Sequence, residues 1–269
     1  MASTALRGAV MDRRKFLNSL SVASVATITG ATTLTEKADA LEDAMDDALN
    51  KRRSKPNACY VDGRPDYDAD DERPYLQHYD PLLPEMPKAP QLADFYNLRF
   101  RPQHVLQSAR LAKIGGFNEK IVTACLLHDI GLNLMNTDHG YWCAQMIAPY
   151  VDEEIAWAIE KHQALRFFPD KDFDYEYPEA YIRMFGADYQ VEPYIEHSYK
   201  EAKKHKWYET SRLITVNDLY SFDRDLTVEV DDYVDIMGRN FKQPKEGLGF
   251  DSSPVAHMWR TLIWPNNRL

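Results

Sequence analysis

Six side chains of this sequence have the chemistry of transition-metal ligands, although they are spread widely along the chain. They are four histidines and two aspartates: His104, His128, Asp129, His139, His162 and Asp218. Imidazole together with carboxylate suits Fe, Mn, Zn or Ni, whereas Ca and Mg favour sites built from oxygen ligands. Six ligands are too many for one catalytic ion that must keep an open position. The set therefore predicts two ions that share a bridging carboxylate.

The pair His128 and Asp129 ends an apolar run, in the stretch CLLHDIG that begins at Cys125. Taken alone, the pair is weak evidence for a metal, because polar residues at a helix end often serve only to cap it. The other members of the set also fall near the ends of predicted helices, and this makes metal binding the stronger interpretation.

Four predicted helices position the histidines. Apolar spacing and stop signals indicate helices over 103–114, 119–130, 139–147 and 153–165, the last three capped by Asn118, Asp138 and Asp152. His104 begins the first helix, His128 ends the second, His139 begins the third and His162 lies in the last turns of the fourth. Antiparallel helices joined by short loops bring alternate ends together, so one end of a bundle is expected to gather all four imidazoles.

Two members of the set have a competing interpretation. His139 follows Asp138, and the two could equally be a surface residue and an N-cap. Asp218 competes with the nearby Asp223 and Asp225 for the role of late ligand. Its place in an apolar stretch favours an inward-facing carboxylate, which needs a partner when it is buried.

The rest of the sequence predicts an all-α protein with one domain behind a loop-rich N-terminal arm over 41–90. The chain has 269 residues, of which 44% are hydrophobic, and few of the alternating Val, Ile and Thr runs that indicate a sheet. Further helices are indicated around 178–187, 192–206, 207–223, 230–238 and 254–263. A net charge of −10 argues against a nucleic-acid partner, which would need clustered Lys and Arg.

Residues 1–40 are predicted to be an export signal rather than part of the fold. Arg13 and Arg14 precede a mild apolar segment, and Ala38-Asp39-Ala40 offers a small-x-small cleavage site. The apolar segment is too short and too polar for a transmembrane helix, so no stable membrane anchor is expected. The pattern predicts recognition by twin-arginine export machinery and a periplasmic location, with a cytosolic amphipathic helix as the alternative.

The order of the ligands resembles the signature of the HD-domain superfamily: a histidine, an adjacent His-Asp pair, and a distant aspartate. Here the matching residues are His104, His128 with Asp129, and Asp218. The additional histidines are similar to those of the dinuclear branch. Within that branch, order and spacing are most similar to the mixed-valent diiron oxygenases, of the myo-inositol oxygenase and organophosphonate-cleaving types.

The resemblance covers about residues 95–225 and implies an HD-type helical bundle over 91–269. It also implies how the ligands divide: one ion would take His104, His128, Asp129 and Asp218, and the other His139, His162 and the second oxygen of Asp129. The implied cofactor is an Fe(II)/Fe(III) pair, with Mn or Zn as alternatives. The implied activity is oxygenation of a small polar or anionic organic substrate.

Two further residues are candidates for substrate binding. The phosphonate-cleaving oxygenases carry a lysine one turn after the last histidine, and this chain has Arg166 there. Arginine keeps the positive charge and adds a fork suited to carboxylate or phosphonate, but a plain salt bridge to an acidic residue is an equal alternative. Tyr96 is a candidate to shield the open metal position, against its simpler interpretation as a core tyrosine.

Two other functions compete with the oxygenase. A metal-dependent phosphohydrolase of the same superfamily would use similar ligands to generate hydroxide and polarise a phosphate. A non-catalytic binding module with a degenerate site is the third, and the intact ligand set counts against it. The helix-end spacing of the histidines and the cation after His162 favour the oxygenase.

Overall fold

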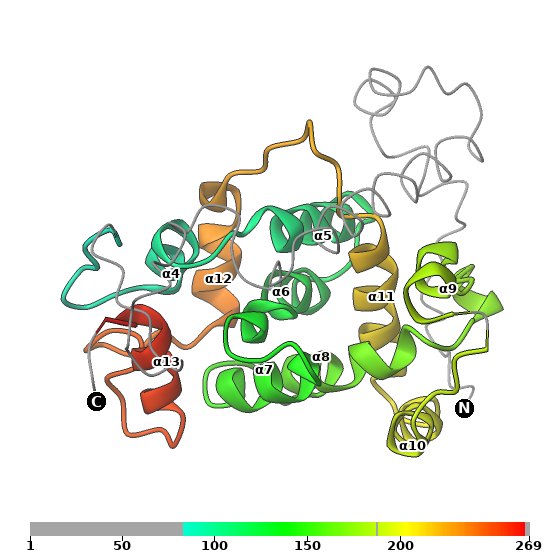
Figure 1. Cartoon of the computed structure of the whole chain (residues 1–269). Coiled ribbons are helices and arrows are strands. Elements are labelled where there is room, and N and C mark those ends of the chain that lie inside the picture. The colour runs from blue at the N-terminus through cyan, green and yellow to red at the C-terminus, as the bar shows by residue number, and fades with distance from the viewer. Residues whose placement is uncertain (1–82, 187, 267–269) are drawn as a thin grey trace, which may run out of the picture.

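The computed structural model describes residues 83–186 and 188–266 (Figure 1). Within these ranges the protein is all-α, which confirms the predicted fold class, and extended pairing is limited to one antiparallel bridge between Asp170 and Tyr175. Residues 83–90, the end of the predicted arm, contain no helix. The predicted export signal and the rest of the arm lie outside the described residues. In the part of the chain that is described, no helix is both long and apolar enough to cross a bilayer.

The α-helices of the described residues are α4 (Leu92–Leu98), α5 (Gln103–Ile114), α6 (Glu119–Leu127), α7 (His139–Ile147), α8 (Glu153–Leu165), α9 (Glu179–Phe185), α10 (Pro193–Ala202), α11 (Tyr208–Leu219), α12 (Val234–Asn240) and α13 (Ala256–Ile263). Short 3-10 helices form corners between them: η1 (Ile130–Asn133), η2 (Lys171–Phe173) and η3 (Val230–Tyr233). The first, third and fourth predicted helices have the expected bounds, whereas several later helices are shorter than predicted, and α4 is additional.

The bundle is built around α5, α6, α7 and α8, with α11 beside them (Figure 1). α5 packs on α6, α7 packs on α8, and α11 contacts α5, α6 and α8. The apolar faces that the spacing predicts are buried, and Val105, Leu127 and Ile214 are each at most 1% exposed. Full burial of one such side chain contributes about 1.5–3 kcal/mol. This packing fixes the helix ends that carry the polar residues.

Two of the three predicted N-caps form. The Asn118 side chain accepts a hydrogen bond from the Ile121 N–H at 3.1 Å, and Asp152 accepts one from the Glu154 N–H at 2.9 Å. Asp138 needs a correction: it occupies the N-cap position of α7 with a left-handed φ of 51°, and its side chain makes no capping bond. Its carboxylate instead accepts a hydrogen bond at 2.9 Å from a tyrosine hydroxyl on α10.

The second predicted helix ends earlier than expected. α6 stops at Leu127, and η1 follows in place of a continued helix to Ile130. Ile130 is fully buried, so hydrophobic spacing alone does not mark the end of the helix. The backbone of η1 packs closely against α7 at this corner. A Cβ added to Gly131 would lie only 2.9 Å from the Cβ of Cys143. The corner carries the His-Asp pair toward the start of α7.

A buried polar cluster holds the end of α8 against α11. Arg212 is 0% exposed and donates from Nη1 to the Leu165 carbonyl at 2.9 Å. Its Nε and Nη2 donate to the Tyr208 hydroxyl at 3.2 and 3.0 Å, and that hydroxyl donates in turn to Asp170. We call Arg212, Tyr208 and Asp170 the scaffold cluster. It fixes the last turn of α8, where His162 lies.

Candidate metal centre

The six predicted ligands lie together where α5, α6, α7, α8 and α11 meet, and we call them the ligand cluster. His104 is in the first turn of α5, His128 and Asp129 follow α6, His139 begins α7, His162 is in the last turn of α8, and Asp218 is in the last turn of α11. The structure therefore brings together all six predicted ligands.

Asp129 lies at the middle of the ligand cluster. Its Oδ1 is 3.1 Å from Nε2 of His139 and 4.0 Å from Nε2 of His162, and its Oδ2 is 3.4 Å from Nε2 of His104. Two sets of ligand atoms, each within 4.8 Å of one another, share this residue: Asp129 with His104 and His128, and Asp129 with His139 and His162. Buried histidine and carboxylate groups in this arrangement could hold a metal ion.

Asp218 completes the cluster on the side of α11. Its Oδ1 is 2.9 Å from Nε2 of His104 and 3.6 Å from Nε2 of His128, and the residue is 2% exposed. The competing Asp223 accepts the Asp225 N–H on its carboxylate at an exposed position. Of the three candidate aspartates, Asp218 is the one beside the histidines.

Each imidazole is oriented by a hydrogen bond on its outer nitrogen. The Nδ1 atoms lie next to backbone carbonyl oxygens: His104 to Ser221 at 3.2 Å, His128 to Cys125 at 2.8 Å, His139 to Asn136 at 3.1 Å and His162 to Ile159 at 2.6 Å. A carbonyl only accepts, so Nδ1 carries the proton and donates. In the neutral ring the Nε2 lone pair then points into the cluster, which is the form that binds metals.

The inner atoms of the cluster are buried without hydrogen-bond partners. They are Nε2 of His128, His139 and His162 and Oδ1 of Asp129 and Asp218. Among the described residues, only Ser108 Oγ and Asn217 Oδ1 share this condition. Each buried polar atom without a partner costs about 1–3 kcal/mol, so five of them facing one volume need an explanation. Metal binding would give these atoms partners, and the buried histidine and carboxylate groups fit a metal ion.

The charges of the cluster also favour a cation. Burial raises the pKa of both carboxylates, but His128 and His139 hold the pKa of Asp129 well below its usual value, and the Arg166 guanidinium does the same for Asp218. Burial lowers the pKa of His104, yet the close carboxylates raise it to about 10. The cluster thus keeps two ionised carboxylates, and in the absence of an ion His104 holds a proton beside them.

Arg166 makes the ion pair that the sequence left as an alternative, but with a member of the ligand cluster. Its Nε donates to Oδ2 of Asp218 at 3.0 Å, and its Nη2 donates to the same oxygen. The side chain of Arg166 is 20% exposed. Arg166 therefore contacts a candidate ligand directly, on the side of the cluster that faces α11.

Tyr96 occupies the core rather than the ligand cluster. It is 0% exposed, and its hydroxyl donates to the Leu126 carbonyl at 2.7 Å. Its ring packs edge-on against Phe95, with centroids 5.9 Å apart, and α4 carries both residues. This placement favours the interpretation as a core tyrosine over contact with a substrate.

Tyr181 of α9 is a residue of the site that sequence reasoning missed. Burial raises its pKa to about 12, and its hydroxyl interacts electrostatically with Arg166, Asp218 and Asp129. Its ring lies 5.8 Å from that of Tyr177 and 6.0 Å from that of Phe185. Tyr181 and Phe185 lie four residues apart on α9, whereas Tyr177 precedes the helix, so no helical spacing in the sequence marked Tyr181 as part of the site.

Gly140 permits the close approach of α7 and α8 at the cluster. A Cβ at this position would lie 2.9 Å from the Ile159 carbonyl oxygen and 3.1 Å from Cε1 of His162. Since the Ile159 carbonyl also accepts the Nδ1 proton of His162, a larger residue would disturb both the ring and its orienting bond.

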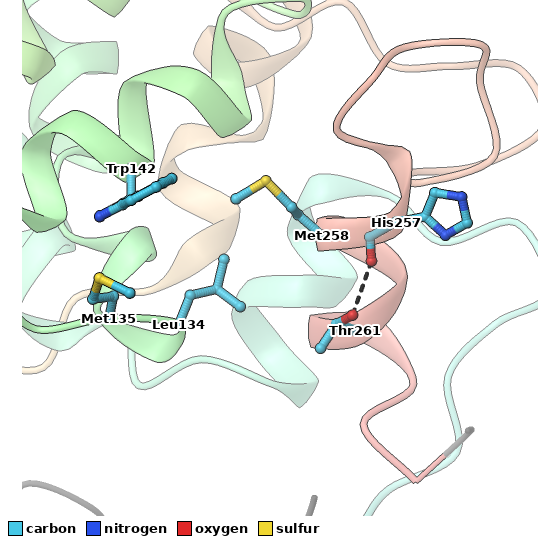
Figure 2. A pocket seen from close by; sticks show the side chains of 6 residues that line it. All are labelled: Leu134, Met135, Trp142, His257, Met258 and Thr261. Carbon is cyan, nitrogen blue, oxygen red and sulfur yellow. Dashed lines mark hydrogen bonds between the residues drawn. The ribbon is translucent and has the colours of Figure 1, made fainter. Parts of the chain in front are cut away.

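An apolar pocket of about 320 Å³ lies apart from the ligand cluster. Figure 2 shows its lining: Leu134, Met135, Trp142, His257, Met258 and Thr261. These residues come from the segment after η1, from α7 and from α13, and none of them belongs to the ligand cluster.

Comparison with protein-family models, curated proteins and solved structures found no match to this chain. The resemblance to the HD-domain superfamily therefore stays a prediction from the order and spacing of the six residues. The geometry of the ligand cluster is the firmer basis for a functional proposal.

Proposed function

We propose that this protein is a dinuclear metal enzyme, a diiron oxygenase of the HD-domain type that acts on a small polar or anionic organic substrate. The observation that carries the proposal is the set of five buried ligand atoms of the cluster, Oδ1 of Asp129 among them, that lack a hydrogen-bond partner. Asp129 belongs to both sets of ligand atoms, with its two oxygens toward different histidines. This supports a carboxylate bridge between two ions.

The two ions would have unequal protein environments. The first would be held by His104, His128, Asp129 and Asp218, and the second by His139, His162 and Asp129. The second ion would thus have fewer protein ligands and more room for substrate. When bound, an Fe(II)/Fe(III) pair supplies open coordination positions and the redox capacity to use dioxygen.

The residues of the chain have separate tasks in this proposal. The backbone carbonyls behind each imidazole keep Nε2 directed inward, so the ligands are oriented before an ion arrives. Burial of the cluster, with His128 and His162 at 0% exposure, keeps bulk water from the inner atoms. Exclusion of water strengthens every electrostatic interaction in the site.

Charge supports a polar or anionic substrate. The protein side of the centre has two carboxylates, Asp129 and Asp218, against the single guanidinium of Arg166. Two ions with at least two positive charges each would leave the loaded centre positive, within a chain whose net charge is −10. A small molecule with a carboxylate, phosphonate or chelating oxygen pair fits that charge.

The test is metal analysis of protein purified without oxygen, with electron paramagnetic resonance of the partly oxidised form. The proposal predicts about two iron ions per chain and a spin-coupled mixed-valent signal. Zn, Mn or Mg together with turnover of a generic phosphodiester would instead support a metal-dependent phosphohydrolase. A full two-ion load in both His139→Ala and His162→Ala would contradict the assignment of the second site.

A further inference from the structure

The two carboxylates of the ligand cluster differ in what their outer oxygens touch. Both oxygens of Asp129 face imidazole nitrogens, with Oδ1 3.1 Å from His139 and Oδ2 3.4 Å from His104. In Asp218 only Oδ1 faces the histidines, at 2.9 Å from His104. Its Oδ2 accepts two hydrogen bonds from Arg166. Both oxygens of Asp129 are therefore available to a metal, whereas in Asp218 only Oδ1 is available.

We propose that Arg166 is a positioning residue that restricts Asp218 to metal ligation through Oδ1 alone. The inference rests on the proposed metal site, but not on the reaction that the site performs. When metal is bound, Asp129 would be free to bridge two ions, whereas Asp218 would serve the first ion through Oδ1.

The geometry of the contact suits this role. Nε and Nη2 lie on one edge of the planar guanidinium, and both donate to the same oxygen of Asp218. Donors fixed in a plane resist rotation of the carboxylate more than a single flexible ammonium does. Asp218 is 2% exposed, so Oδ2 would be buried without Arg166 and would turn toward the ion for a partner.

Arg166 is itself well anchored. It is the C-cap residue of α8, one turn after His162, and its carbonyl accepts the Tyr175 hydroxyl at 2.9 Å. The preceding carbonyl, of Leu165, accepts Nη1 of Arg212 at 2.9 Å. The scaffold cluster therefore supports the backbone that carries Arg166. Through this residue the end of α8 positions Asp218, and within its last turn it carries His162.

The contact has consequences for the ion that Asp218 binds. A carboxylate that shares its negative charge with a guanidinium donates less charge to a metal, so a bound ion would be more electrophilic. Closing Oδ2 also prevents Asp218 from chelating through both oxygens and occupying a further coordination position. The hydrogen bonds of Arg166 to the ligand cluster go to Asp218, so its direct effect would be on the first ion.

The experiment is an anaerobic titration of metal-free protein with Co(II), whose absorption reports the coordination number of each bound ion. The wild-type chain is expected to bind Co(II) in two phases. Arg166→Gln should weaken one phase by about tenfold to a hundredfold and change its spectrum, as outer partners of metal ligands do. Arg166→Lys should be intermediate, since it keeps the charge without the planar fork.

Arg239→Gln is the matched control, because Arg239 pairs with Glu119 on an exposed face and contacts no member of the ligand cluster. It should leave both phases unchanged. Wild-type Co(II) affinities together with a wild-type Co(II) spectrum in Arg166→Gln would overturn the inference. If Arg166→Gln does not fold, wild-type affinity for both ions in Arg166→Lys would contradict the two-donor contact. A wild-type chain that binds no metal would mean that the proposed function itself fails.

Discussion

The scaffold cluster and the ligand cluster are both buried polar groups at the end of α8, yet they differ in completeness. In the scaffold cluster, Arg212 donates to the Leu165 carbonyl and to Tyr208, and Tyr208 donates to Asp170. In the ligand cluster, five inner atoms have no hydrogen-bond partner. A satisfied buried network serves the fold, whereas convergent unsatisfied atoms indicate a ligand that the chain is built to receive.

The largest expected effect comes from removing the shared carboxylate. Asp129→Asn keeps the shape of the side chain but replaces a bridging anion with a neutral amide, so both ions should be lost. Asp218→Asn should release mainly the first ion. Metal content by mass spectrometry, per folded chain, measures both. Retention of two ions by Asp129→Asn would contradict the role of the ligand cluster as a metal site that is bridged by Asp129.

Removing the centre of the scaffold cluster should act on stability instead. Arg212→Met removes the buried donors to the Tyr208 hydroxyl and the Leu165 carbonyl, and it leaves the buried carboxylate of Asp170 without the guanidinium 3.9 Å away. This loss should lower the free energy of unfolding by about 3–5 kcal/mol. Denaturant unfolding of the metal-free protein measures this loss. The expected cost is the same in the metal-loaded protein, because the hydrogen bonds of Arg212 go to none of the six ligands.

A smaller change at the contact between α7 and α8 sharpens the comparison. Gly140→Ala should lower the free energy of unfolding by about 1–3 kcal/mol through overpacking. It should also weaken binding of the second ion, since the new methyl group meets the ring of His162. Gly238→Ala in α12 is the control, because a Cβ there meets no atom within 4 Å. Thermal unfolding with and without metal separates the two variants; equal behaviour would contradict the close approach.

The smallest expected effect concerns protons. His104 has a raised pKa of about 10 in the metal-free protein, against an ordinary value of 6.5. Its contribution to stability is therefore complete below pH 6.5 and is lost as the pH rises toward 10. Metal binding should displace roughly one proton in that window. Calorimetry of metal binding in buffers of different ionisation enthalpy measures the number of protons released. If no proton is released at pH 8, His104 is not protonated in the metal-free protein.

The sequence predicted the parts of this site that local patterns encode. Apolar spacing gave the bounds of α5, α7 and α8, and the helix-end positions of the histidines anticipated their meeting. It did not mark the end of α6 at Leu127, because the apolar run continues through the buried Ile130. Nor did it find the partner of Arg166 or the place of Tyr181, since contacts between distant segments leave no trace in local periodicity.

The most direct measurement is a crystal structure of the anaerobically purified protein, with anomalous scattering recorded at the iron edge. The account predicts two peaks on either side of the Asp129 carboxylate. One peak should lie beside His104, His128 and Asp218, and the other beside His139 and His162. A single peak, or inner atoms of the six residues bonded to ordered water alone, would contradict a two-ion centre.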